Sequence, residues 1–299
     1  MDLWIWITLL AATAQTARFV LQKKLRGGAL STGGSTFARF VYSAPLVAVI
    51  AGAYGGLSGQ GLPALSASFW AYAVAGGISQ IVATMCVVAL FTQRNFAVGI
   101  TFKKTEVLLA AIVGLVVLGE TVSAPALLAI LLGLAGVLLL SDPPSGGNGW
   151  GRVFNRAAGL GLLSGLLFGV SGVAYRGATL ALEQGDTFYR ASMTLACVTA
   201  FQLVAMALWL AWREPGEIGR VLAAWRVAGL VGITSLIGSL CWFAAFSLQT
   251  VALVKAVGQA ELLLSLLAGW LVFGERISPR EWKGLGLLGC SIVMLVLVT

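Results

Sequence analysis

Residues 70–91, WAYAVAGGISQIVATMCVVALF, return 155 positions later as residues 225–246, WRVAGLVGITSLIGSLCWFAAF. The correspondence continues without a gap to residue 140, and on the way it pairs Glu106 with Glu261. A repeat at one fixed offset indicates a duplicated structural unit. Because both copies are almost wholly apolar, we expect the unit to be a set of membrane-spanning helices.

Ten apolar spans fill most of the chain. Since about 20 apolar residues cross a bilayer as a helix, the predicted transmembrane helices are 4–21, 36–54, 69–91, 96–118, 123–141, 157–178, 188–212, 226–247, 250–273 and 281–298. Five spans per unit is an odd number, so the second unit must enter the bilayer upside down, as in many secondary transporters. The sequence therefore predicts an all-α integral membrane protein of ten transmembrane helices in two inverted five-helix repeats, residues 1–141 and 157–299, with a connecting loop at 142–156.

The composition also places the chain in a membrane. Of its 299 residues, 59% are hydrophobic and 10% are charged, with a mean hydropathy of +0.95, whereas soluble domains are about 25% charged. The loops between spans are too short to fold as a second domain. We expect a multi-pass protein of the inner (cytoplasmic) cell membrane, in contact with the lipid bilayer.

Basic residues fall on one side of the predicted spans. Even-numbered loops and both tails hold none beyond the span edges. Odd-numbered loops hold or adjoin twelve of the nineteen: Lys23, Lys24, Arg26, Arg94, Arg152, Arg156, Arg213, Arg220, Arg226, Arg276, Arg280 and Lys283. Lys and Arg are enriched in cytoplasmic loops of membrane proteins. Odd-numbered loops are therefore predicted in the cytoplasm, and both termini outside it.

The sequence does not contain the residues and motifs that several classes of function require. The chain has no His, and each of its four Cys falls inside an apolar span. No phosphate-binding loop, serine-hydrolase elbow or metal-spaced cluster occurs. We therefore expect no enzymatic activity, no metal, no cofactor and no nucleic-acid partner.

Two carboxylates lie near the centres of their spans. Glu106 and Glu261 occupy equivalent positions of the repeat. A carboxylate in hydrocarbon is costly unless it is paired, protonated or facing a cavity. The pair is therefore predicted to serve substrate binding, coupling or gating, with protons as a candidate coupling partner. The other interpretation is a buried structural role, bonded to a hydroxyl or a lysine.

Three lysines lie near these acids in the sequence. Lys103 shares a helix face with Glu106 and is predicted to pair with it in a cavity. Lys255 is predicted to attract an anionic group, or to hold Glu261 or another acid ionised. For Lys104 and Lys255, the alternative is that the ammonium group extends to the membrane interface.

A polar pattern joins the third and eighth spans. Gln80 and Thr84 lie four residues apart, and so do their repeat equivalents Ser235 and Ser239, so each pair occupies one helix face. We predict two facing polar stripes that bind substrate, or else hydrogen bonds between helices. Further predicted substrate-binding residues are Gln15, Tyr175, Trp242 and Gln259.

Four arginines stand at the margins of spans. Arg18 and Arg39 bracket the first predicted cytoplasmic turn, and Arg176 and Arg190 occupy comparable places on the opposite side. They are predicted to form gate-level ion pairs or to contact lipid headgroups.

Small residues predict where helices pack closely, because glycine lets two backbones approach in lipid. They recur at Gly161, Gly165 and Gly169 of the sixth span and at Gly284, Gly286 and Gly289 of the tenth.

Specific motifs resemble the EamA-type families of the drug/metabolite transporter superfamily. They are KTEV at 104–107 with VLGET at 117–121, and AEL at 260–262 with VFGER at 272–276. In that family a Gly-Glu pair closes the fourth helix of each repeat, and the likeness covers roughly 4–141 and 157–298. Many members carry Pro after the mid-helix Glu; this chain has Val107 and Leu262, so it has no proline to break the helix there. The resemblance implies transport of small metabolites, including amino acids and nucleotide-related compounds.

We therefore expect a secondary transporter that moves a small polar or amphipathic metabolite by alternating access. Seven basic groups lie within or at the margins of spans, against two mid-span acids, which favours an anionic or zwitterionic solute. The alternatives are a passive channel or facilitator, a multidrug-type exporter of cationic or aromatic compounds, and a receptor. A monomer is expected, with a dimer as the alternative.

Overall fold

The computed structural model describes residues 2–26, 30–90, 103–140, 156–264 and 278–298, and over these ranges the chain forms eleven α-helices and no strand. The helices are α1 (Leu3–Arg26), α2 (Thr32–Leu57), α3 (Ala67–Leu90), α5 (Glu106–Leu118), α6 (Ala124–Leu140), α7 (Arg156–Leu180), α8 (Thr187–Arg213), α9 (Glu217–Ala223), α10 (Trp225–Leu248), α11 (Val251–Gly258) and α13 (Pro279–Val298). The all-α prediction is confirmed.

Seven helices in the described part of the chain are long and apolar enough to cross a membrane: α1, α2, α3, α7, α8, α10 and α13. Helices α5 and α6 are apolar but shorter. The count of ten spans stays a prediction, because residues 96–102 and 265–273 of two predicted spans, and most of the connecting loop 142–156, lie outside the described residues.

Two predicted spans are interrupted beside their glutamates. A turn at residues 104–105 precedes α5, which begins at Glu106, and a turn at Gln259 follows α11. At the second turn the Gln259 N–H donates to the Ala256 carbonyl oxygen, three residues back, at 3.2 Å. This tighter spacing interrupts the α-helical ladder, a feature often found at functional hinges. The continuous helices predicted for these spans are therefore corrected to broken ones, and no proline is needed to break them.

Polar caps set the ends of several helices. The Ser31 hydroxyl oxygen accepts a hydrogen bond from the Gly34 N–H at the start of α2, and the Asp186 carboxylate accepts one from the Tyr189 N–H at the start of α8, both at 2.9 Å. Such caps satisfy donors that the first helical turn leaves free. The loop predicted around Gly216 is followed by the short helix α9, which the sequence analysis did not predict.

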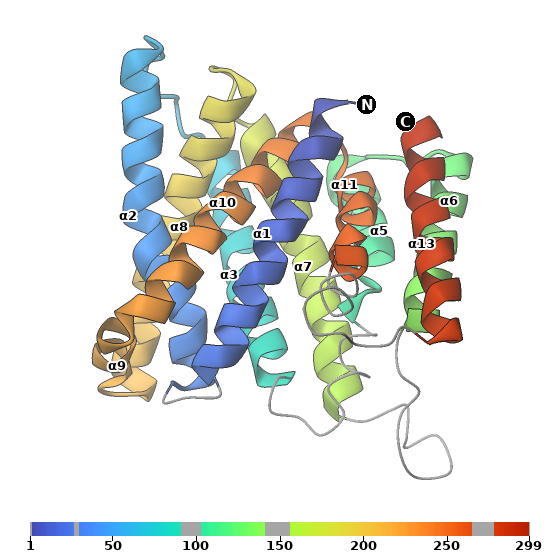
Figure 1. Cartoon of the computed structure of the whole chain (residues 1–299). Helices are drawn as coiled ribbons and strands as arrows, with labels where there is room; N and C mark the ends of the chain where they lie inside the picture. Colours follow the sequence, from blue (N-terminus) through green and yellow to red (C-terminus); the bar gives the residue numbers. More distant parts are fainter. Residues whose placement is uncertain (1, 27–29, 91–102, 141–155, 265–277, 299) are drawn as a thin grey trace.

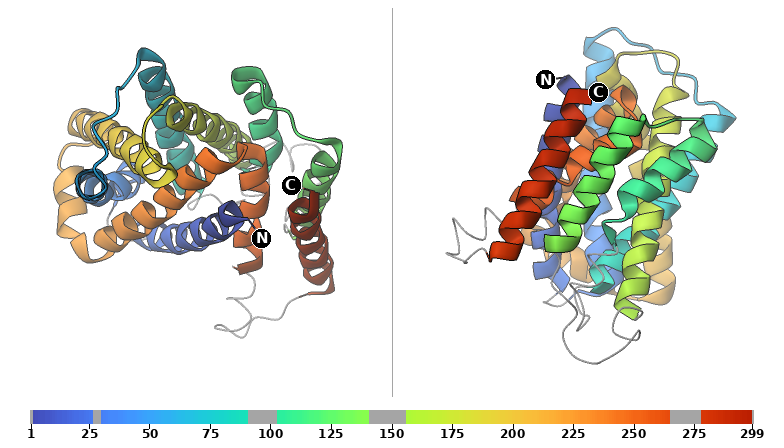
Figure 2. Two further views of the ribbon diagram at one scale, coloured as in Figure 1. Left: turned by 90° about the horizontal axis from the view of Figure 1, so that it is seen from above. Right: turned by 90° about the vertical axis from the view of Figure 1, so that its right-hand side faces the viewer.

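The two halves interlock as one helical bundle (Figure 1). Helix α1 begins and α13 ends at the same end of the bundle, and α1 and α7, the first helices of the two halves, run in opposite directions. The most extensive helix contacts join the halves: α3 with α7, α1 with α10, α2 with α8, and α6 with α13. Seen from above, α6 and α13 lie as a pair at one side (Figure 2). These pairings are symmetric between the halves: the repeat equivalent of α3 with α7 is α10 with α1, and the pairs α2 with α8 and α6 with α13 each join equivalent helices.

Glycines allow the closest helix approaches, as the sequence predicts for Gly165, Gly169 and Gly284. A β-carbon at Gly165 would lie 2.9 Å from the Lys103 carbonyl oxygen, and one at Gly284 would lie 2.9 Å from the Gly136 carbonyl oxygen. Gly286 and Gly289 are a correction to that prediction, because their β-carbon positions face open space.

The pattern of burial is the reverse of that in a soluble protein: many large apolar side chains are exposed and several charged side chains are buried. Large apolar side chains point outward, as with Leu208 at 67% and Leu297 at 79% exposure, while Arg18 and Lys103 are each only 3% exposed. An outer surface of this kind suits lipid, and charges that avoid the lipid must face the interior of the bundle.

Candidate functional site

Seven charged side chains gather inside the bundle. They are Arg18 of α1, Arg39 of α2, Lys103 and Lys104 before α5, Glu106 at the start of α5, Lys255 of α11 and Glu261 after it. Both helix breaks therefore lie at this cluster, where α11 contacts α1, α5 and α7, and α5 also packs on α7. Five cations against two carboxylates leave an excess of three positive charges.

Glu106 lies between two lysines. Its carboxylate is 3.4 Å from the Lys103 ammonium, as the sequence predicts, and 3.8 Å from the Lys255 ammonium. Lys255 was predicted to attract an anionic group or to hold Glu261 or another acid ionised; the ion pair that the structure shows for Lys255 is with Glu106. Sequence spacing could not show this choice, because it depends on how the two halves pack together.

Glu261 has a different set of partners. It forms an ion pair with Lys104 and accepts a hydrogen bond from the Gln15 amide at 2.8 Å. Lys104 and Lys255 are buried, so the alternative that they extend to the interface is wrong. Each carboxylate therefore pairs with a lysine of the other half, and these two ion pairs cross the boundary between the halves.

Arg39 links the two predicted polar stripes. Its guanidinium donates to the Thr84 hydroxyl oxygen at 3.3 Å and to the Ser239 hydroxyl oxygen at 3.0 Å. Thr84 and Ser239 are repeat equivalents, so one arginine bridges matching positions of the two halves. Arg18 is buried nearby, within electrostatic range of Arg39 and Glu261. Its Nη1 has no hydrogen-bond partner in the described part of the chain.

Aromatic rings surround the Lys255 ammonium. It lies 4.7 Å from the ring centroid of Trp242, 5.7 Å from that of Phe168 and 5.8 Å from that of Phe246. Trp242 and Phe246 stack with their centroids 5.8 Å apart. Trp242 was predicted from the sequence, and the two phenylalanines were not, because a phenylalanine in an apolar span carries no signal of its own.

A second polar network lies beside the cluster. The Tyr175 hydroxyl donates to the Gln80 side-chain oxygen at 3.0 Å, and the Gln202 amide donates to the same oxygen at 3.0 Å. The ring of Tyr175 stacks on Phe243. Gln202 was missed, although a lone glutamine within the apolar α8 was a usable signal.

The remaining predicted residues lie apart from the cluster or make few contacts. Arg176 forms an ion pair with Glu120 and donates to the Gln249 carbonyl oxygen at 2.8 Å, which ties α7 to the segments after α5 and α10. Arg190 lies in the first turn of α8 and does not join the cluster. Ser235 and Gln259 are buried, and the Ser235 hydroxyl and the Gln259 side-chain oxygen have no hydrogen-bond partner among the described residues.

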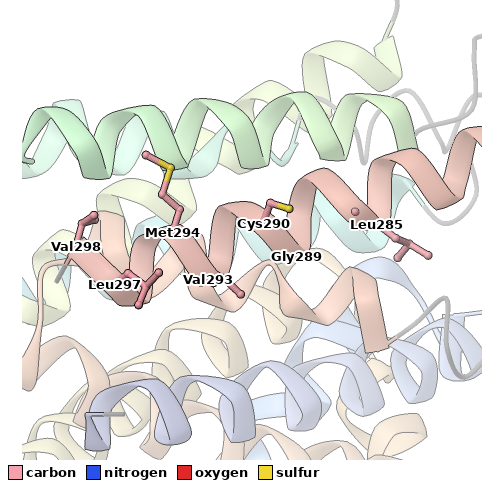
Figure 3. A pocket seen from close by; sticks show the side chains of 8 residues that line it. Leu285, Gly289, Cys290, Val293, Met294, Leu297 and Val298 are labelled. Carbon is pink, nitrogen blue, oxygen red and sulfur yellow. The ribbon is translucent and has the colours of Figure 1, made fainter.

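An open apolar groove of about 570 Å³ lies elsewhere, on α13 (Figure 3). It is lined by Leu285, Gly286, Gly289, Cys290, Val293, Met294, Leu297 and Val298. None of these side chains is charged, and the groove is far more apolar than the interior cluster. It therefore belongs to the apolar outer face of α13.

The fold and the cluster define a helical membrane protein with a charged interior. Residues 155–297 match the model of the EamA-like transporter family. The second half of the chain is therefore similar to the EamA-like transporter family, which agrees with the resemblance drawn from its motifs.

One named protein and one solved structure are also similar to this chain. A protein named riboflavin transporter, from Rhizobium johnstonii, is 29% identical over 171 residues, which are 57% of this chain and 52% of that protein. The matched region thus spans about half the length of this curated relative. A solved structure titled "Crystal structure of protein" has a TM-score of 0.70 and 18% identity, and the match covers 99% of this chain and 96% of the other. That likeness shows a common fold and carries no statement about activity.

Proposed function

We propose that this protein is a secondary transporter of the cytoplasmic membrane that moves a small anionic or zwitterionic metabolite by alternating access. Its ten spans form two inverted repeats, residues 1–141 and 157–299, and its functional unit is the monomer. Opposite directions of the described helices and the self-matching set of helix pairings support this architecture. The EamA-like match and the relative's name support transport as the activity.

The excess of positive charge in the interior cluster is the observation that supports an anionic or zwitterionic substrate. Both carboxylates are paired with lysines, and the hydrogen bonds of the Arg39 side chain go to the hydroxyls of Thr84 and Ser239. Buried cations without counter-charges are costly in a bilayer. A bound carboxylate, phosphate or zwitterion near Arg18 and Arg39 supplies the missing negative charge.

Lysine-paired Glu106 and Glu261 support the gating role proposed for them. Because each ion pair joins the two halves, a rocking motion of one half against the other must break or exchange these pairs. Protons are the proposed coupling partner, through transient protonation of either carboxylate when its lysine moves away. Arg176 and Glu120 form a further proposed gate contact between α7 and the end of α5.

A neutral aromatic solute is the second candidate. The stacked rings of Trp242 and Phe246 favour it, and the Trp242 indole N–H has no hydrogen-bond partner among the described residues. The name of the Rhizobium johnstonii relative points to the same class of compound.

A thermal-shift screen tests the proposal, because a ligand that binds the folded state raises its unfolding temperature. The purified protein is heated with anionic, zwitterionic, cationic and neutral metabolites, riboflavin included. We expect the stabilising compounds to be anionic or zwitterionic, and their effect to disappear in Arg39→Gln. Stabilisation by neutral aromatics alone supports the second candidate, and stabilisation by cations alone overturns both.

A further inference from the structure

The aromatic rings and the carboxylate around Lys255 have the composition of a cation-binding site. Rings of Trp242, Phe168 and Phe246 lie within 6 Å of the ammonium, and Glu106 supplies a negative charge 3.8 Å away. Aromatic faces and a carboxylate are the groups by which proteins hold organic ammonium compounds. Here that position is filled by a side chain of the protein itself.

We propose that Lys255 is a specificity-determining residue: a tethered cation that occupies an aromatic box and thereby excludes cationic solutes from the transport site. The box consists of Trp242, Phe168 and Phe246. This inference rests on the proposed function, because it concerns the selectivity of the same site. The ligand class that Lys255 excludes is small primary and quaternary ammonium cations that carry no carboxylate.

Lys255 is held in the box by packing on several sides. It is buried, and a β-carbon at Gly172 of α7 would lie 3.8 Å from its Cε. Lys103 lies 5.2 Å from the Phe168 ring centroid and 3.4 Å from Glu106, so a second ammonium is already accommodated at the edge of the box. A free cation that replaces the Lys255 ammonium would therefore meet the same surroundings that the native side chain meets.

The consequence is that truncation should convert an occupied site into a vacant one. Lys255→Ala removes three methylene groups and the ammonium, which together have the size of n-propylammonium. The rings and Glu106 stay in place to bind it. Lys104→Ala is the matched control, because Lys104 is also a buried lysine paired with the equivalent carboxylate, Glu261, yet no aromatic ring in the described ranges lies over its ammonium.

The test is thermal unfolding of the full chain in detergent, with n-propylammonium chloride titrated against propan-1-ol and sodium chloride. We expect n-propylammonium to stabilise Lys255→Ala saturably, at concentrations roughly tenfold lower than any effect on the native chain or on Lys104→Ala, as expected for a buried cation–π site. Propan-1-ol, the neutral analogue, should not do so. Adding Trp242→Leu to Lys255→Ala should weaken the effect. Equal responses of Lys255→Ala and Lys104→Ala would overturn the proposal.

If Lys255→Ala does not fold alone, the same probe gives a second measurement. n-Propylammonium present during growth and solubilisation should then restore the yield of folded Lys255→Ala, and propan-1-ol should not. Failure of both compounds to restore it overturns the proposal. The metabolite screen uses the native chain and Arg39→Gln, so failure of the proposed function appears there and does not decide how Lys255→Ala responds to n-propylammonium.

Discussion

Replacing Lys104 with Met and Glu261 with Gln, singly and together, measures how strongly one ion pair joins the two halves. The side chains of Lys104 and Glu261 are 4% and 12% exposed, so either single change leaves the other charge buried without its ionic partner. Removing one member of a buried pair costs about 3–5 kcal/mol. The double variant removes both charges of this pair and so leaves neither partner alone, and the Gln15 amide can still donate to the new amide oxygen at position 261.

We therefore expect the double variant to be less destabilised than the sum of the single variants, with a coupling of about 2 kcal/mol. Equilibrium unfolding in mixed micelles gives the three free energies of unfolding. Lys283→Met is the control, because Lys283 is exposed at the start of α13 and its loss should change stability by less than about 0.5 kcal/mol. Additive effects of the two single changes would refute the ion pair between the halves.

Three further predictions follow from single features. Gly136→Ala should destabilise the protein by about 1–3 kcal/mol, because the new β-carbon would lie 2.8 Å from the Leu288 backbone nitrogen of α13. The control is Gly229→Ala, which has open space around the new β-carbon and should not destabilise the protein. Equal effects of the two changes on stability would contradict the close packing of α6 and α13. Asp186→Ala should cost about 1 kcal/mol at neutral pH as the α8 cap is lost. The Tyr189 N–H holds the pKa of Asp186 below its ordinary value of 3.8. The contribution of this carboxylate to the free energy of unfolding is therefore complete above pH 3.8, and it is lost as the pH falls through the lower pKa of the folded state. If the urea midpoints of the native chain and of Asp186→Ala fail to converge at acid pH, this explanation is wrong. Terminal reporter fusions should place both ends outside the cytoplasm, and cytoplasmic fluorescence from the C-terminal fusion would reverse the predicted orientation.

The sequence predicted the helices well because lipid imposes a simple rule on them. A span must be apolar and about 20 residues long, so the cores of α1, α2, α3, α7, α8, α10 and α13 could be placed from composition alone. The short helix α9 escaped because it lies among polar and charged residues between two spans. The breaks beside Glu106 and Glu261 escaped because neither contains a proline.

The sequence predicted which residues form the candidate site better than it predicted which of them contact one another. The repeat offset identified Thr84 with Ser239, and Arg39 does bridge them. The Lys103–Glu106 pair followed from helical spacing. The pairing of Lys255 with Glu106 could not be predicted, because the two residues come from different halves and meet only through docking of α11 against α5. The contact of Phe168 with Lys255 could not be predicted for a related reason. A phenylalanine in an apolar helix looks like any other apolar residue until the structure places a cation beside its ring.

Counterflow in proteoliposomes tests transport by this site most directly. Vesicles are loaded with the anionic or zwitterionic compound that gives the largest thermal shift, and a trace of the labelled compound is added outside. We expect a transient accumulation of label above its equilibrium level, which a carrier produces and a channel does not. The overshoot should be lost in Arg39→Gln and retained in Lys283→Gln. Simple equilibration of label without overshoot, or an equal overshoot in Arg39→Gln, would contradict a carrier whose anion site lies between the two halves.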